Sequence, residues 1–402
     1  MVDVDGLVGA QGEDLVDDFD GHADAGAEAA GVGQEDAHGV LRVAGAGCAG
    51  HDDSRERRVS RTDDTPVIAP PTGRAGVLLD VPADASGLPI PTRAPTLEEA
   101  WAYVRRLAGG HYENFSVLSR LVPPDLRDDF AAVYAYCRWS DDLADETGAG
   151  DAGRADARRL LAWWRGQMLA CFAHARAEPA DEPRHPVFVA LAQTARRHGL
   201  SPEPFGRLLD AFEQDQRVSR YRTWDEVMGY CKNSADPVGR IVLALAGHDG
   251  SRPGDAERFA MSDATCSALQ LTNHWQDVRR DLVERDRVYL PSEETGLTAE
   301  DLRRMLDRAD DPAARVRYIR AVRPLVERTR EMFRAGRPLP RTLDRPMRPV
   351  VWLFGAGGEA VLSRIERVGC ATLWDRPRLS RSRKAWLVGL AAARAALARR
   401  GR

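Results

Sequence analysis

Several features that mark common classes of protein are absent from this chain of 402 residues. Its six cysteines include no CxxC pair, so we predict neither a zinc site nor a redox dithiol. We expect such scattered thiols to be reduced and mostly buried in a cytoplasmic protein. No apolar run approaches the roughly 20 residues that span a bilayer. No Lys or Arg precedes Arg42, whereas a secretory signal peptide begins with positive charge.

An excess of charge of either sign is missing as well. The formal net charge is −4, and lysine occurs only at Lys232 and Lys384. A chain this close to neutral has no overall basic field, which argues against a nucleic acid as its partner.

Aromatic residues are rare in residues 1–93, a segment that is rich in Ala, Gly and Asp and ends in Pro-rich stretches. This composition cannot bury enough apolar surface to offset the entropy lost on ordering. We therefore expect residues 1–93 to be a disordered, low-complexity segment. A start codon assigned too far upstream would produce the same composition, and the sequence does not separate these two explanations.

The amino-acid composition of residues 94–380 is different. Long stretches there consist of Ala, Leu, Arg and Glu, with apolar residues three and four positions apart. Capping-box patterns at Thr96–Glu99, Thr223–Glu226 and Thr298–Asp301 mark the starts of helices. No alternating strand runs with hairpin turns occur. We therefore predict an all-α fold, a single large helical-bundle domain over residues 94–380.

The C-terminal residues 381–402 contain seven cations and no acid. Trp386, Leu387, Leu390 and Leu397 would share one face of a helix there. Such a basic amphipathic helix could contact the anionic inner face of a membrane. The alternative, which we favour, is an ordinary terminal helix or a frayed tail.

The first motif that could take part in catalysis or metal binding comprises Asp141, Asp142 and Asp145. On a helix, Asp141 and Asp145 project from the same face and repel each other unless a cation lies between them. Mg²⁺ binds carboxylates of this kind together with substrate phosphates. A solvated acidic helix face is the alternative. The neighbouring Arg138 would either contact phosphate or pair with a carboxylate of its own helix.

The second motif comprises Asn273, Asp277 and Asp281, spaced four and eight residues apart, with Gln270 one turn earlier. We expect these side chains to line one face of a helix over two turns. An exposed charged helix is the alternative. Together the two motifs predict a shared cavity in the bundle, in which two or three Mg²⁺ ions hold a diphosphate. Asp215 would either assist the first metal cluster or cap a helix.

The two motifs, the sequence from Arg287 to Pro291 and the segment around Tyr230 resemble the squalene and phytoene synthases over about residues 98–375. Within that superfamily the segment from His111 to Phe115 is most similar to the hydroxysqualene synthases. Asn114 and Gln276 depart from squalene and phytoene synthases proper, which usually carry serine and arginine there. The resemblance implies a helical bundle of the isoprenoid synthase type with a central cavity.

Particular residues acquire expected roles from the motifs and from the resemblance. The metal ligands would be Asp141, Asp142, Asp145, Asn273, Asp277 and Asp281. The catalytic set would be Asp141, Asp145, Asp277, Asp281 and Tyr230. The substrate would contact His111, Asn114, Phe115, Tyr134, Arg138, Gln270, Val238, Gly239, Arg287 and Tyr289.

The resemblance also implies a reaction. A hydroxysqualene synthase ionises presqualene diphosphate with Mg²⁺, rearranges the carbocation and lets water capture it, without NADPH. Such a lyase would be coupled functionally to a presqualene diphosphate synthase and to an oxidoreductase that processes hydroxysqualene. One alternative is a prenyl transferase that joins farnesyl or geranylgeranyl diphosphate head to head into presqualene diphosphate, squalene or phytoene. The alternative of another class is a non-catalytic assembly factor with the same fold.

Overall fold

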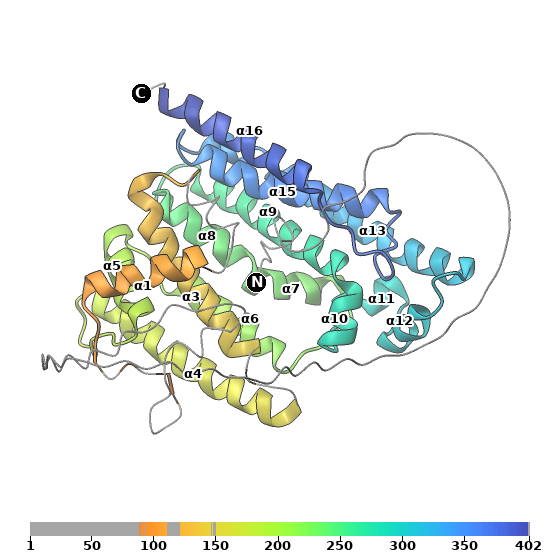
Figure 1. Ribbon diagram of the computed structural model, residues 1–402, viewed down its shortest axis with the longest axis horizontal. Helices are drawn as coiled ribbons and strands as arrows, with labels where there is room; N and C mark the ends of the chain where they lie inside the picture. The colour runs from red at the N-terminus through yellow and green to blue at the C-terminus, as the bar shows by residue number, and fades with distance from the viewer. Residues whose placement is uncertain are drawn as a thin grey trace, which may run out of the picture. The chain divides into compact units, whose positions relative to one another are not determined.

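A computed structural model of the chain describes residues 88–89, 91, 93–110, 121–145, 147 and 150–400. Helices account for the regular structure of these residues, and the only β interaction in them is an isolated bridge between Arg220 and Val288 (Figure 1). The prediction of an all-α fold is thus confirmed. The predicted substrate contacts His111, Asn114 and Phe115 lie outside the described residues, as does nearly all of the segment 1–93.

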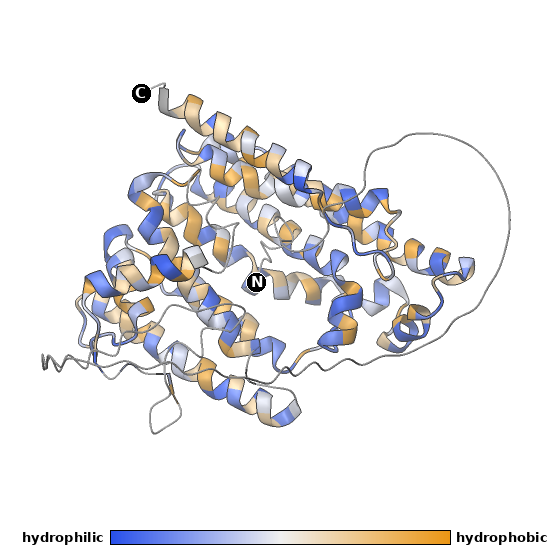
Figure 2. Cartoon of the chain, in the orientation of Figure 1, coloured by the Kyte–Doolittle hydropathy of each residue, from blue (hydrophilic) through white to orange (hydrophobic). Residues whose placement is uncertain are grey.

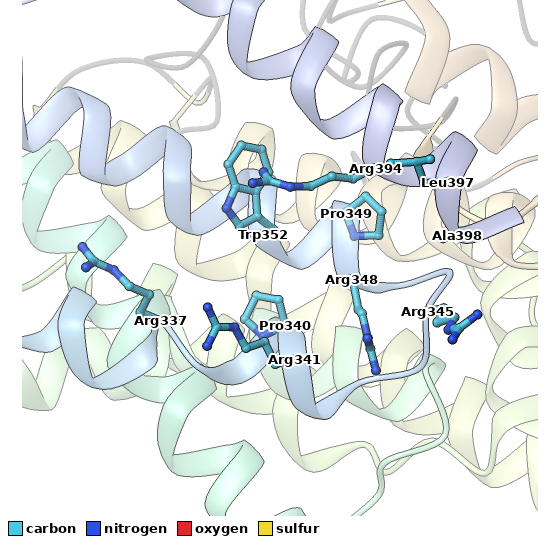
Figure 3. A pocket seen from close by; sticks show the side chains of 10 residues that line it. All are labelled: Arg337, Pro340, Arg341, Arg345, Arg348, Pro349, Trp352, Arg394, Leu397 and Ala398. Carbon is cyan, nitrogen blue, oxygen red and sulfur yellow. The ribbon is translucent and has the colours of Figure 1, made fainter. Parts of the chain in front are cut away.

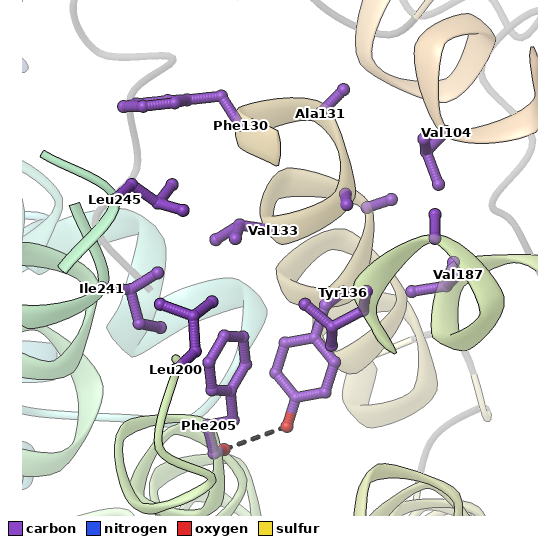
Figure 4. Packing of buried hydrophobic residues seen from close by; sticks show 14 of the residues in the cluster. Val104, Phe130, Ala131, Val133, Tyr136, Val187, Leu200, Phe205, Ile241 and Leu245 are labelled. Carbon is purple, nitrogen blue, oxygen red and sulfur yellow. Dashed lines mark hydrogen bonds between the residues drawn. The ribbon is translucent and has the colours of Figure 1, made fainter. Parts of the chain in front are cut away.

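The helices in the first half of the described chain pack around a core that is rich in aromatic rings. Tyr136 lies at its centre, and its hydroxyl donates a 2.9 Å hydrogen bond to the carbonyl oxygen of Phe205 (Figure 4). Trp139 and Trp164 stack at 5.3 Å between ring centroids. The elements that build this half are α1 (Leu97–Gly110), the 3₁₀ turn η3 (Pro124–Leu126), α3 (Arg127–Asp145), α4 (Gly150–Ala175), α5 (Pro186–His198) and α6 (Glu203–Asp215).

Helix α9 (Asp255–Gln276) is the central helix of the second half, where it contacts α7, α8, α13, α14 and α15. Its length brings the second acidic motif, at its C-terminal end, close to elements from several parts of the chain. The other elements of this half are α7 (Trp224–Ser234), α8 (Asp236–Leu245), α10 (Val278–Glu284), α11 (Ser292–Thr295), α12 (Ala299–Leu306), α13 (Pro312–Gly336), α14 (Leu339–Thr342), α15 (Arg348–Arg367) and α16 (Arg381–Arg400).

The starts of several helices follow directly from local sequence. The hydroxyl of Thr223 accepts from the backbone of Glu226 while the Glu226 carboxylate accepts from the backbone of Thr223. Thr298 and Asp301 form the same reciprocal pair at α12. Each pair satisfies amide groups that a helix start leaves without partners. The predicted helix starts at these positions are confirmed.

Helix α8 approaches α9 closely because Gly239 has no side chain. A Cβ at this position would overlap Ser262 Oγ and would lie only 2.7 Å from the sulfur of Cys266. Gly239 therefore has a structural role in packing, in addition to the substrate contact predicted for it. In the part of the chain that the structure describes, no helix combines the length and the apolar character needed to cross a membrane (Figure 2).

Candidate active site

The first acidic motif lies at the C-terminal end of α3, where Asp142 is the partner of Arg138. The Arg138 guanidinium contacts both oxygens of this carboxylate, with Nη2 at 2.6 Å and Nε at 3.1 Å. Only 3% of the Asp142 side chain is exposed. The alternative interpretation of Arg138, a salt bridge within its own helix, is therefore observed. Of the three aspartates in this motif, Asp142 is the least available to a metal ion.

Asp141 and Asp145 belong to the same helix end, and Arg138 compensates the charge of Asp141 less well than that of Asp142. Arg138 is 4.0 Å from Asp141, at the limit of an ion pair. Burial and the charge of Asp145 raise the pKa of Asp141 well above its usual range. Asp141 is half-buried and Asp145 is exposed. A cation between these two repelling carboxylates would stabilise both.

The second acidic motif does not lie on one continuous helix, so the prediction of a two-turn stripe was wrong in that respect. Helix α9 ends at Gln276, α10 begins at Val278, and Asp277 between them has a φ of −105° and a ψ of 17°. The four-residue spacing nevertheless survives the break. The amide of Asp277 donates to the carbonyl oxygen of Asn273, and the amide of Asp281 donates to that of Asp277, both at 2.9 Å.

Asp277 is paired with an arginine from far along the chain. Arg376, in the segment between α15 and α16, contacts both oxygens of this carboxylate, with Nε at 2.5 Å and Nη2 at 3.0 Å. The neighbouring Gln276 donates a 2.6 Å hydrogen bond from Nε2 to the carbonyl oxygen of Pro377. The second motif thus fixes the segment that leads into α16. No pattern in the sequence identified Arg376, because its partner is 99 positions away.

Asp281, in contrast, is buried without an arginine within ion-pairing distance among the described residues. Only 9% of the residue is exposed. Burial, and then the charge of Asp277, raise the pKa of Asp281 to about 7. Asp281 is therefore, like Asp141 with its distant Arg138, a carboxylate whose negative charge is weakly compensated.

The structure brings the two acidic motifs together. Arg285, which follows Asp281 at the end of α10, lies with Nη2 at 3.4 Å from an oxygen of Asp145. The positive charge of Arg285 also acts on Asp141 and Asp281. The prediction that the motifs face one shared site is consistent with this contact, although Arg285 was absent from the predicted set.

Asp215, at the end of α6, is the acceptor at which three predicted site residues meet. The hydroxyl of Tyr230 donates to Oδ2 at 2.9 Å, and that of Tyr289 lies 3.4 Å from Oδ1. Arg287 reaches the same residue, with Nη2 donating to the backbone carbonyl at 3.1 Å and Nη1 at 3.8 Å from Oδ2. Asp215 therefore holds two tyrosines and an arginine in place. This role differs from the two that were predicted for it, metal ligand and helix cap.

Aromatic rings enclose this acceptor. His274 stacks on Tyr289 with ring centroids 3.7 Å apart and planes at 14°, and Tyr221 stacks on the same ring at 5.4 Å. Burial raises the pKa of Tyr230 and of Tyr289 well above the usual range, so both remain phenols. Burial lowers the pKa of His274 well below its usual range, so the imidazole is neutral. Tyr221 and His274 were missing from the predicted set.

The remaining predicted residues lie at or near these elements. Gln270 is buried on α9 one turn before His274, and its Oε1 atom makes no hydrogen bond to the described residues. Asn273 is half-buried at the end of α9. Tyr134, half-buried on α3 one turn before Arg138, and Val238, half-buried on α8, both pack against the first hydrophobic core.

The residues present fit a Mg²⁺–diphosphate site rather than a closed metal cage. Among the described residues, no three carboxylates, imidazoles or thiolates converge closely enough to hold an ion by themselves. Mg²⁺ typically binds one or two carboxylates and takes its other ligands from water and phosphate. Asp141, Asp145 and Asp281 offer such oxygens, and burial together with a neighbouring carboxylate raises the pKa of Asp141 and of Asp281.

Comparison with known proteins places the chain in one family. The squalene/phytoene synthase family profile matches residues 108–383, more than half of the chain. A hydroxysqualene synthase from Zymomonas mobilis is 39% identical over 201 residues, which cover 48% of this chain and 61% of that protein. A hydroxysqualene synthase from Rhodopseudomonas palustris is 33% identical over 230 residues, covering 56% of this chain and 70% of that protein.

Solved structures agree with this assignment. The crystal structure of squalene synthase HpnC from Alicyclobacillus acidocaldarius has 38% sequence identity and a TM-score of 0.57, and the match covers 68% of this chain and 95% of that one. A dehydrosqualene synthase, at 20% identity and a TM-score of 0.57, shares the fold. On the evidence of the matched residues and the shared fold, the chain belongs to the squalene/phytoene synthase family of enzymes.

Proposed function

We propose that this protein is a hydroxysqualene synthase. It ionises presqualene diphosphate with the help of Mg²⁺, and water captures the rearranged carbocation to give hydroxysqualene and diphosphate. The observation that carries the proposal is the contact between the two acidic motifs through Arg285 and Asp145, beside the acceptor Asp215. The relatives from Zymomonas mobilis and Rhodopseudomonas palustris are named hydroxysqualene synthases, although the match spans only 61% of the Zymomonas protein.

Departure of the diphosphate requires stabilisation of several negative charges at once. Asp141, Asp145 and Asp281 would hold Mg²⁺, which supplies Lewis-acid stabilisation of the leaving group. Arg285 and Arg287 add guanidinium groups whose fork geometry suits phosphate oxygens. The Arg287 guanidinium donates a 3.1 Å hydrogen bond to the backbone carbonyl of Asp215 and lies 3.8 Å from the Asp215 carboxylate. These two contacts orient Arg287.

The carbocation needs an apolar, aromatic environment. The faces of aromatic rings stabilise a cation by about 0.5–2 kcal/mol each. Tyr230, Tyr289, Tyr221 and His274 supply such rings next to the acidic motifs. The raised pKa values of the tyrosines keep them as neutral phenols, which are poorer nucleophiles than phenolates and would not trap the cation.

Gln276 favours the hydroxysqualene branch over head-to-head condensation. Squalene and phytoene synthases usually carry arginine at this position, so the glutamine leaves one cation fewer beside the diphosphate. The structure gives this glutamine a different task, a hydrogen bond to the carbonyl of Pro377. The head-to-head synthase is the second candidate, because a Thermus thermophilus phytoene synthase is 33% identical over 211 residues.

The test is an incubation of the purified protein with presqualene diphosphate and Mg²⁺, without NADPH, followed by mass spectrometry of the lipid extract. We expect hydroxysqualene from the wild type and none with EDTA or from the Asp141→Ala/Asp277→Ala variant. The matched control is Asp156→Asn, which changes an exposed aspartate of α4 and should retain activity. Condensation of farnesyl or geranylgeranyl diphosphate instead would move the function to the synthase branch.

If no prenyl diphosphate reacts, the assembly-factor alternative becomes the better explanation. A cytoplasmic enzyme of this kind would receive its substrate from a presqualene diphosphate synthase and pass its product to an oxidoreductase. Because both substrate and product carry a long apolar chain, we propose that the enzyme works at the inner face of a membrane.

A further inference from the structure

An arginine-rich cavity of about 490 Å³ lies at the ends of α13 and α16, and its lining includes no residue of the candidate active site. Figure 3 shows the side chains that line it. Its walls come from the end of α13, from α14, from the start of α15 and from the end of α16. We call it the arginine groove, after the residues Arg337, Arg341, Arg345, Arg348 and Arg394, which line it together with Trp352.

Most of this positive charge is not neutralised by the protein. Glu359 pairs with Arg337 through hydrogen bonds of 3.1 and 2.8 Å. Arg341, Arg348 and Arg394 have no carboxylate within ion-pairing distance among the residues that the structure describes. Exposed guanidinium groups that line one cavity without paired acids attract an anion.

Two exposed apolar side chains lie on α16, and one of them lines the groove. Leu397, 68% exposed, lines it, and Trp386 on the same helix is 53% exposed. They are eleven residues apart, so they point in the same direction to within about 20°, about three helical turns from each other. The expectation that Leu387 shares this face was wrong. Leu387 is only 4% exposed and lies about a quarter turn around the helix from Trp386, on the side where α16 packs against α15.

Two arginine side chains lie over tryptophan rings on this surface. The Arg394 guanidinium lies 3.7 Å from the centroid of the Trp352 ring, and that of Arg383 lies 4.5 Å from the Trp386 ring. A surface that presents both guanidinium groups and exposed Trp and Leu matches the two layers of a membrane interface, the phosphate headgroups and the first apolar carbons.

We propose that the arginine groove and the exposed face of α16 dock the protein on an anionic phospholipid membrane, with a lipid phosphate in the groove. A soluble phosphate would use the arginines but would leave Trp386 and Leu397 without a role, which is why the geometry favours a lipid. The proposal rests on this surface alone and does not depend on the reaction catalysed at the candidate active site.

The test is sedimentation of the purified full-length protein with vesicles, in the absence of any prenyl diphosphate. The vesicles are phosphatidylcholine alone, or phosphatidylcholine and phosphatidylglycerol in equal parts. We expect binding to the anionic vesicles only, with an affinity that falls as salt increases. Near an anionic surface each arginine contributes about a five-fold change in affinity. The variant Arg341→Gln/Arg348→Gln should therefore bind about 25-fold more weakly.

Two further variants separate the explanations. Trp386→Ser should also weaken binding to anionic vesicles, because it removes the apolar anchor without changing charge. Arg106→Gln/Arg158→Gln removes two exposed arginines from α1 and α4 and should bind like the wild type. Circular dichroism checks that each variant is folded.

Either of two results would overturn the proposal. One is equal vesicle binding by the wild type and by Arg341→Gln/Arg348→Gln. The other is a groove that binds inorganic phosphate or diphosphate, with vesicle binding unaffected by Trp386→Ser, which would identify a site for a soluble anion. Loss of vesicle binding with full enzymatic turnover would leave the proposed function intact, so the two proposals fail separately.

Discussion

Replacement of Arg376 by alanine tests how the second acidic motif is held. The guanidinium contacts both oxygens of Asp277, whose side chain is only 9% exposed. Removal of one partner from a buried ion pair costs about 3–5 kcal/mol. Here Arg376 is 34% exposed, and Arg280 remains 3.6 Å from the carboxylate, so we expect the smaller loss of about 1–3 kcal/mol in unfolding free energy.

The assay is thermal or urea unfolding of four proteins: wild type, Arg376→Ala, Asp277→Asn and the double variant. Because Asp277→Asn removes the buried charge, Arg376→Ala should destabilise the Asp277→Asn protein much less than it destabilises the wild type. The difference between the two losses is the coupling energy of the pair. Equal losses in both backgrounds would refute the reasoning.

The same variants test the predicted metal site. Arg376→Ala leaves Asp277 without its strongest partner and therefore more available to a cation. If Asp277 is a Mg²⁺ ligand, Mg²⁺ with diphosphate should raise the melting temperature of Arg376→Ala more than that of the wild type. Equal stabilisation of both proteins would contradict a competition between Arg376 and a metal ion for Asp277.

Three further predictions follow from other parts of the structure. Asp215→Asn should lower kcat/KM for the prenyl diphosphate at least ten-fold. The Tyr230 hydroxyl loses a charged acceptor, whose hydrogen bond contributes about 1.5–3 kcal/mol, and Arg287 loses its counterion. Unchanged steady-state kinetics would contradict this. Gly239→Ala should destabilise the protein by about 1–3 kcal/mol in urea unfolding, with partial rescue by Ser262→Ala, because the new Cβ overlaps the serine hydroxyl. Burial raises the pKa of Asp236 to about 7, so the folded protein binds this proton more tightly than the unfolded chain does. Stability should therefore fall as pH rises from the ordinary aspartate range through about 7, and thermal unfolding at about pH 5 and about pH 8 should show a smaller fall for Asp236→Asn.

The fold was predictable because its signals are local. The residues of a capping box lie within four positions of one another, and the apolar periodicity of a helix repeats every few residues. Both signals survive in the structure, from the reciprocal hydrogen bonds of Thr223 and Glu226 to the central helix α9. The acidic motifs were found for the same reason, since each occupies a short stretch of sequence.

Two partners of those motifs, Arg376 and Arg285, were not predictable, because they come from distant elements. Arg376 lies 99 positions from Asp277, and no spacing rule connects the two. The contacts of Tyr230, Tyr289 and Arg287 with Asp215 were missed for the same reason, since they span 15, 74 and 72 positions. The break between α9 and α10 was also missed. The sequence around Asp277 contains no Gly or Pro, so nothing local marks the end of the helix.

The distribution of charge in the site bears on whether the protein is an enzyme or an assembly factor of the same fold. A purely structural protein has no use for a buried carboxylate without a partner, since its charge opposes folding near neutral pH. Asp142 and Asp277 have arginine partners and would suit either kind of protein. Arg138 reaches Asp141 only at 4.0 Å, and no arginine pairs with Asp281 among the described residues. Burial and a neighbouring carboxylate raise the pKa of both, and a bound cation would relieve that cost. Retention of these two costly carboxylates at the meeting point of both motifs therefore favours the catalytic interpretation.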